Sequence, residues 1–393
     1  MNIETAVILA AGKGTRLIPL TINRPKVLLP VGGIPLLKRQ IDMLITLGVR
    51  NIVLVVNYRA ESIKAFIDNT YANNDEVSFS FINQGKPLGT AHAVEVTEEY
   101  VYPPFIVLYG DIYTTYDVLN CLIKTLDHAD AAIVAIKVPD PWNYGVFKVD
   151  DKNRIFDVIE KPSPGKEPSN LINGGIYAFR DLVIFDYIRK TGISPRGEKE
   201  FTDSIKYMAR DYVIKATTVN REKWYDIGKP WDLLEANKAA LIHSGMYVDS
   251  NADISDKAII VPPVYIDENV KVESHARIGP YVALLNGVSV SKGASIRNSI
   301  VFENTKIGRH AIIEDSLIGA NVVIRENVEF LSKWISKDTV WYRLNGKFVD
   351  SKVDSFGAVV GDHVFIAEHS IICPGVFIMP KRRVKGLVVD DII

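Results

Sequence analysis

The sequence has little of what marks secreted, metal-rich or membrane-embedded proteins. Only two of its 393 residues are cysteine, Cys121 and Cys373, and their separation matches no zinc or redox spacing. We therefore expect small buried thiols in a reducing compartment. The opening apolar run from Ala6 to Ala11 is short, lacks a basic flank and ends at Gly12, so it predicts no secretory signal. No stretch reaches the length of a membrane span, and we expect a cytoplasmic protein with no membrane partner.

An excess of charge of either sign is also lacking. The 46 basic and 47 acidic residues leave a net charge of −1. A near-neutral chain is poorly suited to coating nucleic acid, so we expect no nucleic-acid partner. Any phosphate that the protein handles must then be held by a local site. At 393 residues the chain is also too long for one ordinary core, which predicts two domains.

The first part of the chain, residues 1–243, has the pattern of an α/β domain. An amphipathic helix is predicted between Leu36 and Leu47. Buried strands are predicted at Thr5–Leu9, Ile52–Val56, Phe105–Tyr109 and Ala131–Val138. Strand, helix and strand in this order predict a mostly parallel sheet with helices on both faces. Ligands bind such sheets at the carboxyl ends of the strands, where Gly12 and Asp111 fall.

The remaining part, residues 244–393, repeats with a period of six. An aliphatic or aromatic residue returns at Ile254, Ile260, Ile266, Val272, Ile278, Leu284, Val290 and Ile296, then at Val301, Ile307 and Ile313, then at Ile318, Ile324 and Phe330, and again at Val360, Ile366, Ile372 and Ile378. This period is typical of hexapeptide repeats, in which three hexads form one triangular coil of a β-helix. Residues 331–355 interrupt it, and Asn345-Gly346 between apolar residues predicts an inserted hairpin there.

The loop after the first predicted strand has the features of a phosphate site. Gly12 and Gly14 let backbone N–H groups approach phosphate oxygens, and Arg16 and Lys26 add two cations just beyond them. The loop matches neither a Walker A motif nor a complete dinucleotide fingerprint, since Leu17 stands where the third glycine would be.

Together with motifs further along the chain, this loop resembles the sugar-phosphate nucleotidyltransferase family, in particular glucose-1-phosphate thymidylyltransferases and related uridylyl- and guanylyltransferases. The motifs that carry the resemblance, in family order, are Leu9-Ala10-Ala11-Gly12-Lys13-Gly14-Thr15-Arg16-Leu17 with Pro25-Lys26, Gln84 with Pro87-Leu88-Gly89-Thr90-Ala91, Tyr109-Gly110-Asp111, Tyr144-Gly145-Val146, Ile159-Glu160-Lys161-Pro162, Asn173-Gly174-Gly175-Ile176-Tyr177, Glu200-Phe201-Thr202-Asp203, and Trp224-Tyr225-Asp226-Ile227-Gly228. The resemblance implies a Rossmann-like nucleotidyltransferase domain with a mostly parallel mixed sheet, followed by a left-handed parallel β-helix.

The resemblance also implies a Mg²⁺-dependent reaction of a nucleoside triphosphate with a sugar 1-phosphate, releasing pyrophosphate. Arg16, Lys26, Asp111 and Asp226 would be catalytic, with the two aspartates supplying the oxygen ligands that Mg²⁺ prefers. The nucleotide site would comprise Leu9, Ala11, Gly12, Gly14, Thr15, Arg16, Lys26, Gln84, Gly89 and Thr90. The sugar-phosphate site would comprise Gly145, Glu160, Lys161 and Asn173, with Lys161 holding the phosphate and Glu160 accepting hydrogen bonds from hydroxyl groups.

The choice of substrates stays open at this level. Gln84 can both donate and accept a hydrogen bond, which suits uracil or thymine, so we expect UTP or dTTP with glucose 1-phosphate or N-acetylglucosamine 1-phosphate. Asn57-Tyr58-Arg59 instead resembles a stretch of mannose-1-phosphate guanylyltransferases.

The β-helix leaves two further alternatives. We expect it to assemble the chain into a homo-oligomer. It could also acetylate a sugar amine, with a base among His275, His310, His363 and His369 and a coenzyme A phosphate site at Lys381, Arg382, Arg383 and Lys385. Catalytically inactive regulatory subunits share the same layout, but the charged residues expected of an enzyme are all present here, which favours catalysis.

Overall fold

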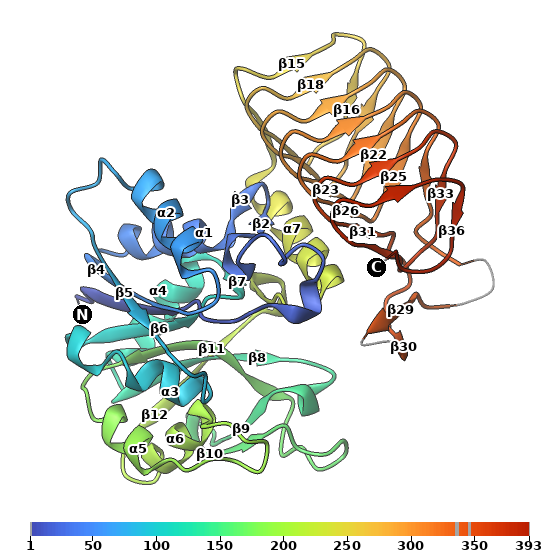
Figure 1. Ribbon diagram of the computed structural model, residues 1–393. Coiled ribbons are helices and arrows are strands. Elements are labelled where there is room, and N and C mark those ends of the chain that lie inside the picture. The colour runs from blue at the N-terminus through green and yellow to red at the C-terminus, as the bar shows by residue number, and fades with distance from the viewer. Residues whose placement is uncertain (1, 335–337, 345–346, 393) are drawn as a thin grey trace. The chain divides into compact units, whose positions relative to one another are not determined.

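The computed structural model describes residues 2–334, 338–344 and 347–392 (Figure 1). The chain divides into two compact units. The first consists of the residues up to Lys13 together with Leu36–Asp226. The second consists of Gly14–Pro35 and the chain from Ile227 onward. The domain boundary after residue 243 stays a prediction from the sequence.

A nine-stranded mixed sheet forms the centre of the first unit, in the order β5-β4-β1-β6-β11-β8-β12-β10-β9. Its strands are β1 (Thr5–Leu9), β4 (Asn51–Val56), β5 (Ser78–Asn83), β6 (Phe105–Tyr109), β8 (Ala131–Lys137), β9 (Gly145–Val149), β10 (Arg154–Glu160), β11 (Leu171–Phe179) and β12 (Ile214–Val219). Strands β5, β4, β1 and β6 run parallel to one another, as do β8 and β12. Strand β11 pairs antiparallel with β6 and β8, and β10 pairs antiparallel with β12 and β9. The predicted mostly parallel sheet is therefore confirmed, with a mixed half.

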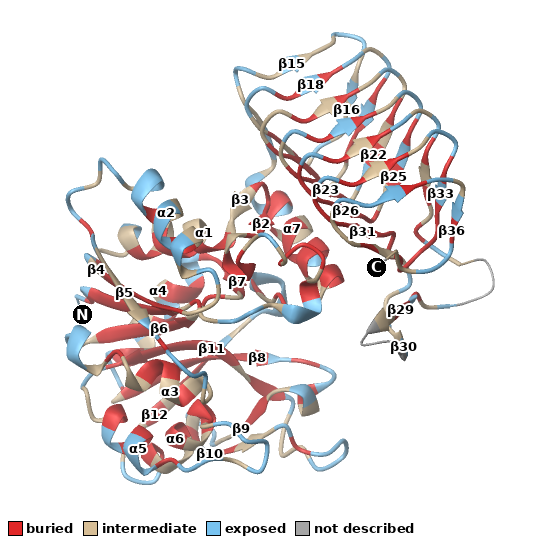
Figure 2. Cartoon of the chain, in the orientation of Figure 1, coloured by how far each residue is buried: buried red, intermediate tan, exposed pale blue. Residues whose placement is uncertain are grey.

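Helices cover both faces of this sheet (Figure 1). They are α1 (Leu36–Thr46), α2 (Ala60–Thr70), α3 (Thr90–Glu95), α4 (Tyr116–Leu126), α5 (Ile184–Lys190) and α6 (Phe201–Met208), with 3₁₀ turns η3 (Glu98–Tyr100), η4 (Pro141–Asn143) and η5 (Arg221–Lys223). Apolar residues of α3, α5 and α6 join one core with alternate residues of β1, β4, β6 and β8. Figure 2 shows that the central strands are buried. Successive side chains of a strand point to opposite faces of the sheet, and here helices cover both faces, so nearly every residue of these strands is buried. A short separate ladder pairs β7 (Ile112–Thr114) with β13 (Trp224–Asp226).

The second unit contains the predicted left-handed parallel β-helix, built from three seven-stranded parallel sheets. The first sheet holds β14 (Met246–Val248), β17 (Val264–Ile266), β20 (Val282–Leu284), β23 (Ile300–Val301), β26 (Leu317–Ile318), β31 (Val359–Val360) and β34 (Phe377–Ile378). The second holds β15 (Asp253–Ile254), β18 (Lys271–Val272), β21 (Ser289–Val290), β24 (Lys306–Ile307), β27 (Val323–Ile324), β32 (Phe365–Ile366) and β35 (Arg383–Val384). The third holds β16 (Ile259–Ile260), β19 (Arg277–Ile278), β22 (Ser295–Arg297), β25 (Ile312–Glu314), β28 (Glu329–Phe330), β33 (Ile371–Ile372) and β36 (Leu387–Val388).

The register of the coils confirms the six-residue period. Val272 pairs with Val290, and Val290 with Ile307, so each aliphatic residue stacks on its equivalent in the next coil. The stacked residues form one buried core. Within the interruption, where the sequence predicts a hairpin, β29 (Trp341–Leu344) pairs antiparallel with β30 (Lys347–Asp350). Its proposed turn residues, 345–346, lie outside the described part of the chain.

The rest of the second unit packs on the β-helix. It comprises η1 (Thr15–Leu17), η2 (Lys26–Leu28), a small hairpin of β2 (Pro30–Val31) and β3 (Ile34–Pro35), and α7 (Pro230–Ser244). Trp231 of α7 makes edge contacts with the rings of Tyr342 and Phe356, at centroid distances of 4.8 and 5.7 Å. None of the helices in the described ranges is long and apolar enough to cross a membrane.

Candidate active site

The carboxyl end of β1 forms the first part of the candidate site. Leu9 ends this strand opposite Tyr109, and its carbonyl accepts the N–H of Gly110 at 3.0 Å. The chain then leaves the sheet through half-buried Ala11 and exposed Gly12. A Cβ added at Gly12 would meet nothing within 4 Å, so the backbone here is open to a ligand. Backbone N–H groups of such a loop can approach phosphate oxygens closely.

A second loop brings Gln84, Gly89 and Thr90 together. Buried Gln84 donates from Nε2 to the carbonyl of Gly89 at 3.1 Å. Gly89 has a φ of +122°, and a Cβ there would lie 2.5 Å from the carbonyl oxygen of Lys199, so only glycine fits. The hydroxyl of Thr90 accepts the N–H of Phe201 at 3.0 Å. These contacts hold the loop against residues 199–201.

Of the two predicted metal ligands, Asp226 lies on the short ladder of β7 and β13, and Asp111 lies in the turn directly before β7. Asp226, the last residue of β13, pairs with Ile112, the residue that follows Asp111. Neighbouring strands are about 4.8 Å apart, so Asp111 and Asp226 come from adjacent positions of the chain across this ladder. Across the described ranges, no group of three or more His, Cys, Asp or Glu side chains could hold a metal by itself. Carboxylate oxygens are the ligand type that a hard cation such as Mg²⁺ prefers.

A buried glutamine closes the turn that carries Asp111. Gln40 of α1 is fully buried, and its Nε2 donates to the carbonyls of Tyr109 and Ile112 at 3.0 and 2.7 Å. One amide therefore holds both sides of the turn through Asp111. Helical periodicity places Gln40 in a helix but does not reveal this role.

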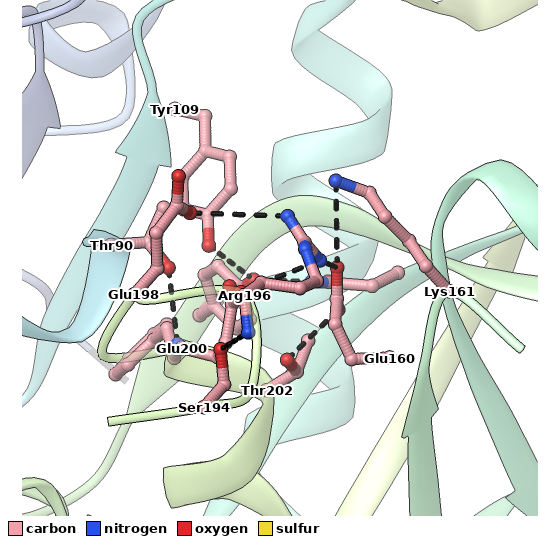
Figure 3. A network of polar contacts seen from close by, with 12 residues as sticks. Thr90, Tyr109, Glu160, Lys161, Ser194, Arg196, Glu198, Glu200 and Thr202 are labelled. Carbon is pink, nitrogen blue, oxygen red and sulfur yellow. Dashed lines mark hydrogen bonds and ion pairs between the residues drawn. The ribbon is translucent and has the colours of Figure 1, made fainter. Parts of the chain in front are cut away.

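A cluster of charged side chains surrounds Glu160 (Figure 3). Glu160 accepts hydrogen bonds from the hydroxyl of Thr202 at 2.9 Å and from Arg196 at 3.0 Å. The Lys161 ammonium lies 3.8 Å from the same carboxylate, and Arg196 also lies 3.3 Å from Glu200. Two cations thus converge beside an oriented carboxylate. The side chain of Glu160 is 18% exposed, whereas those of Lys161 and Arg196 are 45% and 38% exposed and can reach a ligand.

Gly145 and Asn173 lie next to this cluster. A Cβ at Gly145 would lie 2.8 Å from Thr202, 2.9 Å from the Glu160 carboxylate and 3.6 Å from Asn173. The four residues predicted to bind the sugar phosphate therefore lie close together in the first unit. The amide of Asn173 donates to the hydroxyl of Tyr177 at 2.6 Å, which fixes its orientation.

Burial and the negative charge of Glu160 raise the pKa values of two neighbouring carboxyl groups. The pKa of the Glu200 carboxyl is raised, first by burial and then by the negative charge of Glu160. The pKa of Asp203 is raised by the same two causes in the same order. Burial also raises the pKa values of Tyr109 and Tyr177, whose hydroxyl groups lie 3.2 Å apart, so both rings stay neutral at physiological pH.

The backbone of Lys161 is held in an uncommon conformation. Lys161 follows the end of β10 and has a φ of +42°, and its N–H donates to the carbonyl of Tyr144 at 3.0 Å. A residue other than glycine in this region costs about 1 kcal/mol or more, and such strain concentrates at functional sites. The conformation turns the chain directly after Glu160, at the end of β10.

The remaining predicted nucleotide residues belong to the second unit. Gly14 has a φ of +63°, and a Cβ there would lie 3.0 Å from Cβ of Lys26. The carbonyl of Gly14 accepts the Thr21 hydroxyl at 2.8 Å. Thr15 and Arg16 are exposed, whereas Lys26 is buried. Residues 14–28 therefore form a self-packed loop that brings Lys26 against Gly14.

The four histidines considered for acetyl transfer occupy corners of the β-helix. His275, His310, His363 and His369 are exposed and have φ values of 62°, 56°, 60° and 58°. Each thus lies at a left-handed turn between strands, a position that a structural role also explains.

Comparison with known proteins gives the family. The nucleotidyl transferase family model matches residues 5–242. This chain belongs to that family. The predicted enzyme class is therefore confirmed, and members of the family generally use a divalent metal. A second model, the GMPPB C-terminal domain, matches residues 260–393.

Curated relatives of this nucleotidyl transferase match nearly its whole length. Bifunctional protein GlmU of Methanococcus aeolicus is 37% identical over 387 residues, covering 94% of this chain and 90% of the relative. A bifunctional sugar-1-phosphate nucleotidylyltransferase/acetyltransferase of Sulfurisphaera tokodaii is 31% identical over 403 residues, covering 98% and 97%. A crystal structure of UDP-glucose pyrophosphorylase with UDP-glucose has a TM-score of 0.54 at 23% identity and covers 62% of this chain and 98% of its own, which shows the shared fold.

Several residues of the site were missed from the sequence. Thr202 lies in a motif used for the resemblance but received no role, and Arg196 lies ahead of it in a Ser-Pro-Arg-Gly turn. An irregular turn gives no periodic signal in the sequence, so only the structure shows that Arg196 donates a hydrogen bond to Glu160. Gln40 was missed because its contacts come from a sheet far along the sequence.

Proposed function

We propose that this chain is a sugar-1-phosphate nucleotidylyltransferase that forms a nucleotide sugar and pyrophosphate. The observation that carries the proposal is the cluster in which Lys161 and Arg196 flank the oriented carboxylate of Glu160. A sugar phosphate presents the complementary groups, a dianion for the cations and hydroxyls for the carboxylate. The relative from Sulfurisphaera tokodaii, which is named as a sugar-1-phosphate nucleotidylyltransferase and acetyltransferase, supports the same substrate class.

The reaction requires little of the protein beyond alignment and charge neutralisation. A phosphate oxygen of the sugar phosphate attacks the α-phosphorus, and the bond from that phosphorus to the bridging oxygen breaks, releasing pyrophosphate. The nucleophile is already anionic, so no general base is needed. Lys161 and Arg196 would position it, while Arg16 and Lys26 would hold the triphosphate and balance charge in the transition state.

We assign the divalent cation as Mg²⁺, bound by Asp111 and Asp226. When bound, it would neutralise phosphate charge and help orient the triphosphate. Gln40 would keep Asp111 in place by holding both carbonyls of its turn.

The base is proposed to be a pyrimidine. One N–H of Gln84 is used by Gly89, and the amide also carries a second N–H and an oxygen, the pattern that suits the imide edge of uracil or thymine. We therefore propose UTP or dTTP with glucose 1-phosphate or N-acetylglucosamine 1-phosphate. Mannose 1-phosphate with GTP remains the alternative to test.

The test is a matrix of five nucleoside triphosphates against these sugar phosphates, with Mg²⁺, scored by released pyrophosphate. We expect the strongest turnover with a pyrimidine nucleotide. Strongest turnover with GTP would overturn the assignment of the base. Absence of turnover in every combination would overturn the proposed function and favour an inactive regulatory subunit.

A second activity, acetyl transfer to a sugar amine, is favoured by one observation. The chain covers nearly all of a relative named as a nucleotidylyltransferase and acetyltransferase. Release of free thiol from acetyl coenzyme A on adding an amino-sugar phosphate would test it. Substitutions of His363 and His369, which lie on the coils after the inserted hairpin, would locate the site.

We also propose that the chain is a homo-oligomer in the cytoplasm. Ile371 and Leu387 are exposed partners on adjacent strands of the third β-helix sheet, so they form an apolar strip suited to self-association. Light scattering after size-exclusion chromatography should give a mass above one chain. Charged substitutions at both positions should return it to a monomer.

A further inference from the structure

The segment that carries Gly14, Arg16 and Lys26 is anchored on the β-helix by an ion pair. Arg24 forms a fork with Glu303, in which Nη1 lies 3.1 Å from Oε1 and Nη2 lies 2.9 Å from Oε2. The guanidinium also lies 4.6 Å from the ring centroid of Phe302. Side-chain exposure is 19% for Arg24 and 35% for Glu303, so the pair is partly shielded from water. A bidentate pair of this kind fixes orientation as well as distance.

A second anchor lies beside the first. The Asn23 amide donates to Oδ2 of Asp362 at 3.2 Å, while the other oxygen of this buried carboxylate accepts the N–H of Ala320 at 2.9 Å. One carboxylate therefore joins the segment to the backbone of a coil. Asp362 and Glu303 come from different coils, so the segment is held across the stack rather than at a single turn.

The far end of the segment is fixed by close packing. A Cβ at Gly33 would lie 2.0 Å from the ring of Tyr265, so the backbone there rests directly on that ring. The N–H of Gly32 donates to the side chain of Asn237 at 2.9 Å, and the same side chain donates to the carbonyl of Tyr281 at 3.5 Å. Residues 23–33 are thus attached to the β-helix at both ends.

These anchors act on the proposed phosphate ligands through short chain connections. Arg24 precedes Pro25, which is the N-cap of η2, and Lys26 is the first residue of that turn. Lys26 packs in turn against Gly14, next to Thr15 and Arg16. A shift of Arg24 would therefore be transmitted to Lys26 and to the self-packed loop before it.

We propose that the β-helix is the structural support of the nucleotide-binding segment and that Arg24 and Glu303 are positioning residues for Arg16 and Lys26. The proposal rests on the proposed nucleotidyl transfer for the role of the loop. It assigns to the β-helix a part in that reaction, separate from assembly or acetyl transfer.

The test uses the full-length protein with Arg24→Met, which keeps the apolar stem, and Glu303→Gln, which keeps the shape. Each should raise KM for the nucleoside triphosphate on the order of three- to tenfold and leave KM for the sugar phosphate unchanged, since a partly exposed pair contributes modestly. The double variant should be no worse than either single one, and the reversed pair Arg24→Glu with Glu303→Arg should recover part of the loss.

The β-helix offers a matched control. Arg297 and Glu314 form a similar fork, at 3.2 and 3.1 Å, between neighbouring strands of the third sheet, whereas Glu303 follows a strand of the first sheet. Arg297→Met and Glu314→Gln should leave both KM values unchanged. Equal kinetics in the Arg24 and Arg297 variants would overturn the proposal, as would additive losses from Arg24→Met and Glu303→Gln.

Hydrogen exchange separates this inference from the proposed function. Amides of residues 14–28 should exchange faster in Arg24→Met than in the wild type or in Arg297→Met. Unchanged exchange would overturn the anchoring even in an active enzyme. If the wild type turned over no substrate pair, the proposed function would fail, while faster exchange would still support the anchoring.

Discussion

Replacing Gly145 with alanine tests the geometry of the proposed sugar-phosphate site most directly. The added methyl would lie 2.8 Å from Cγ2 of Thr202 and 2.9 Å from Oε2 of Glu160. The first distance is roughly 0.7 Å short of an optimal contact between carbon atoms. Both neighbours are side-chain ends, so the methyl fits only if Thr202 or Glu160 moves. Either movement strains the hydrogen bond of 2.9 Å between them.

The size of the effect follows from what that bond holds. A hydrogen bond to a charged group contributes about 1.5–3 kcal/mol, and each 1.4 kcal/mol is a factor of about ten. Misplacing a substrate contact by about 1 Å can cost on the order of 100-fold in rate. We therefore expect Gly145→Ala to lower kcat/KM for the sugar phosphate roughly 10- to 100-fold. KM for the nucleotide should change little.

The control is Gly192→Ala in the same unit. A Cβ at Gly192 would meet nothing within 4 Å, and its φ is not in the left-handed region, so this variant should behave as the wild type. Initial rates with each substrate varied in turn, together with thermal melts of both variants, complete the assay. Wild-type kinetics for the sugar phosphate in a folded Gly145→Ala protein would refute the placement of the sugar beside Glu160.

Three further outcomes follow from the same contacts. Gly89→Ala should lower the melting temperature, by roughly 2–4 °C per kcal/mol of strain, because its Cβ would lie 2.5 Å from a backbone oxygen; Gly85→Ala, with a φ of +65° but open space, is the control. In Glu200→Gln, the free energy of unfolding should rise relative to the wild type as pH increases above the ordinary glutamate range. Because the pKa of Glu200 is raised in the folded state, its contribution to the stability of the wild type is complete at low pH and is lost as the pH rises through the folded-state pKa. Urea titrations at several pH values would measure the difference between the two proteins. A difference that does not depend on pH would contradict the prediction. Asp226→Asn should reduce kcat on the order of 100-fold or more and raise the Mg²⁺ concentration for half-maximal rate; an unchanged Mg²⁺ dependence would remove Asp226 from the metal site.

The secondary structure was largely predictable because both halves carry strong periodic signals. The apolar runs at Thr5–Leu9 and Phe105–Tyr109 are strands with the predicted bounds. The repeat continues in the structure beyond the predicted series, to Val384 and Val388. The same six-residue pattern recurs in every coil, so a single irregular residue does not hide the period. The two five-residue steps at Val301 and Ile318 appear as regular pairings in the first sheet.

Site residues could be predicted from the sequence where a polar residue or a glycine lies in a strand or at its end. They could not be predicted where the contact joins segments that are far apart in the sequence. Gly145, Glu160 and Asn173 lie in or at the ends of β9, β10 and β11, which adjoin in the sheet. Their convergence follows from topology once the strands are ordered. Arg196 reaches the same carboxylate from an irregular loop, and no local pattern predicts that contact.

The glycine-rich motif is continuous in sequence but divided in structure. Leu9 to Lys13 belong to the unit of the nine-stranded sheet, whereas Gly14 onward belongs with the β-helix. The division cannot be predicted from the motif, because the contacts that decide it, such as Arg24 with Glu303, join residues 279 positions apart. A substitution on the β-helix near Phe302 or Asp362 is therefore expected to disturb nucleotide binding, although it lies far along the chain from every motif of the nucleotidyl transferase. Truncation before residue 303 should likewise damage nucleotide binding rather than only assembly, because it removes the partners of Asn23 and Arg24.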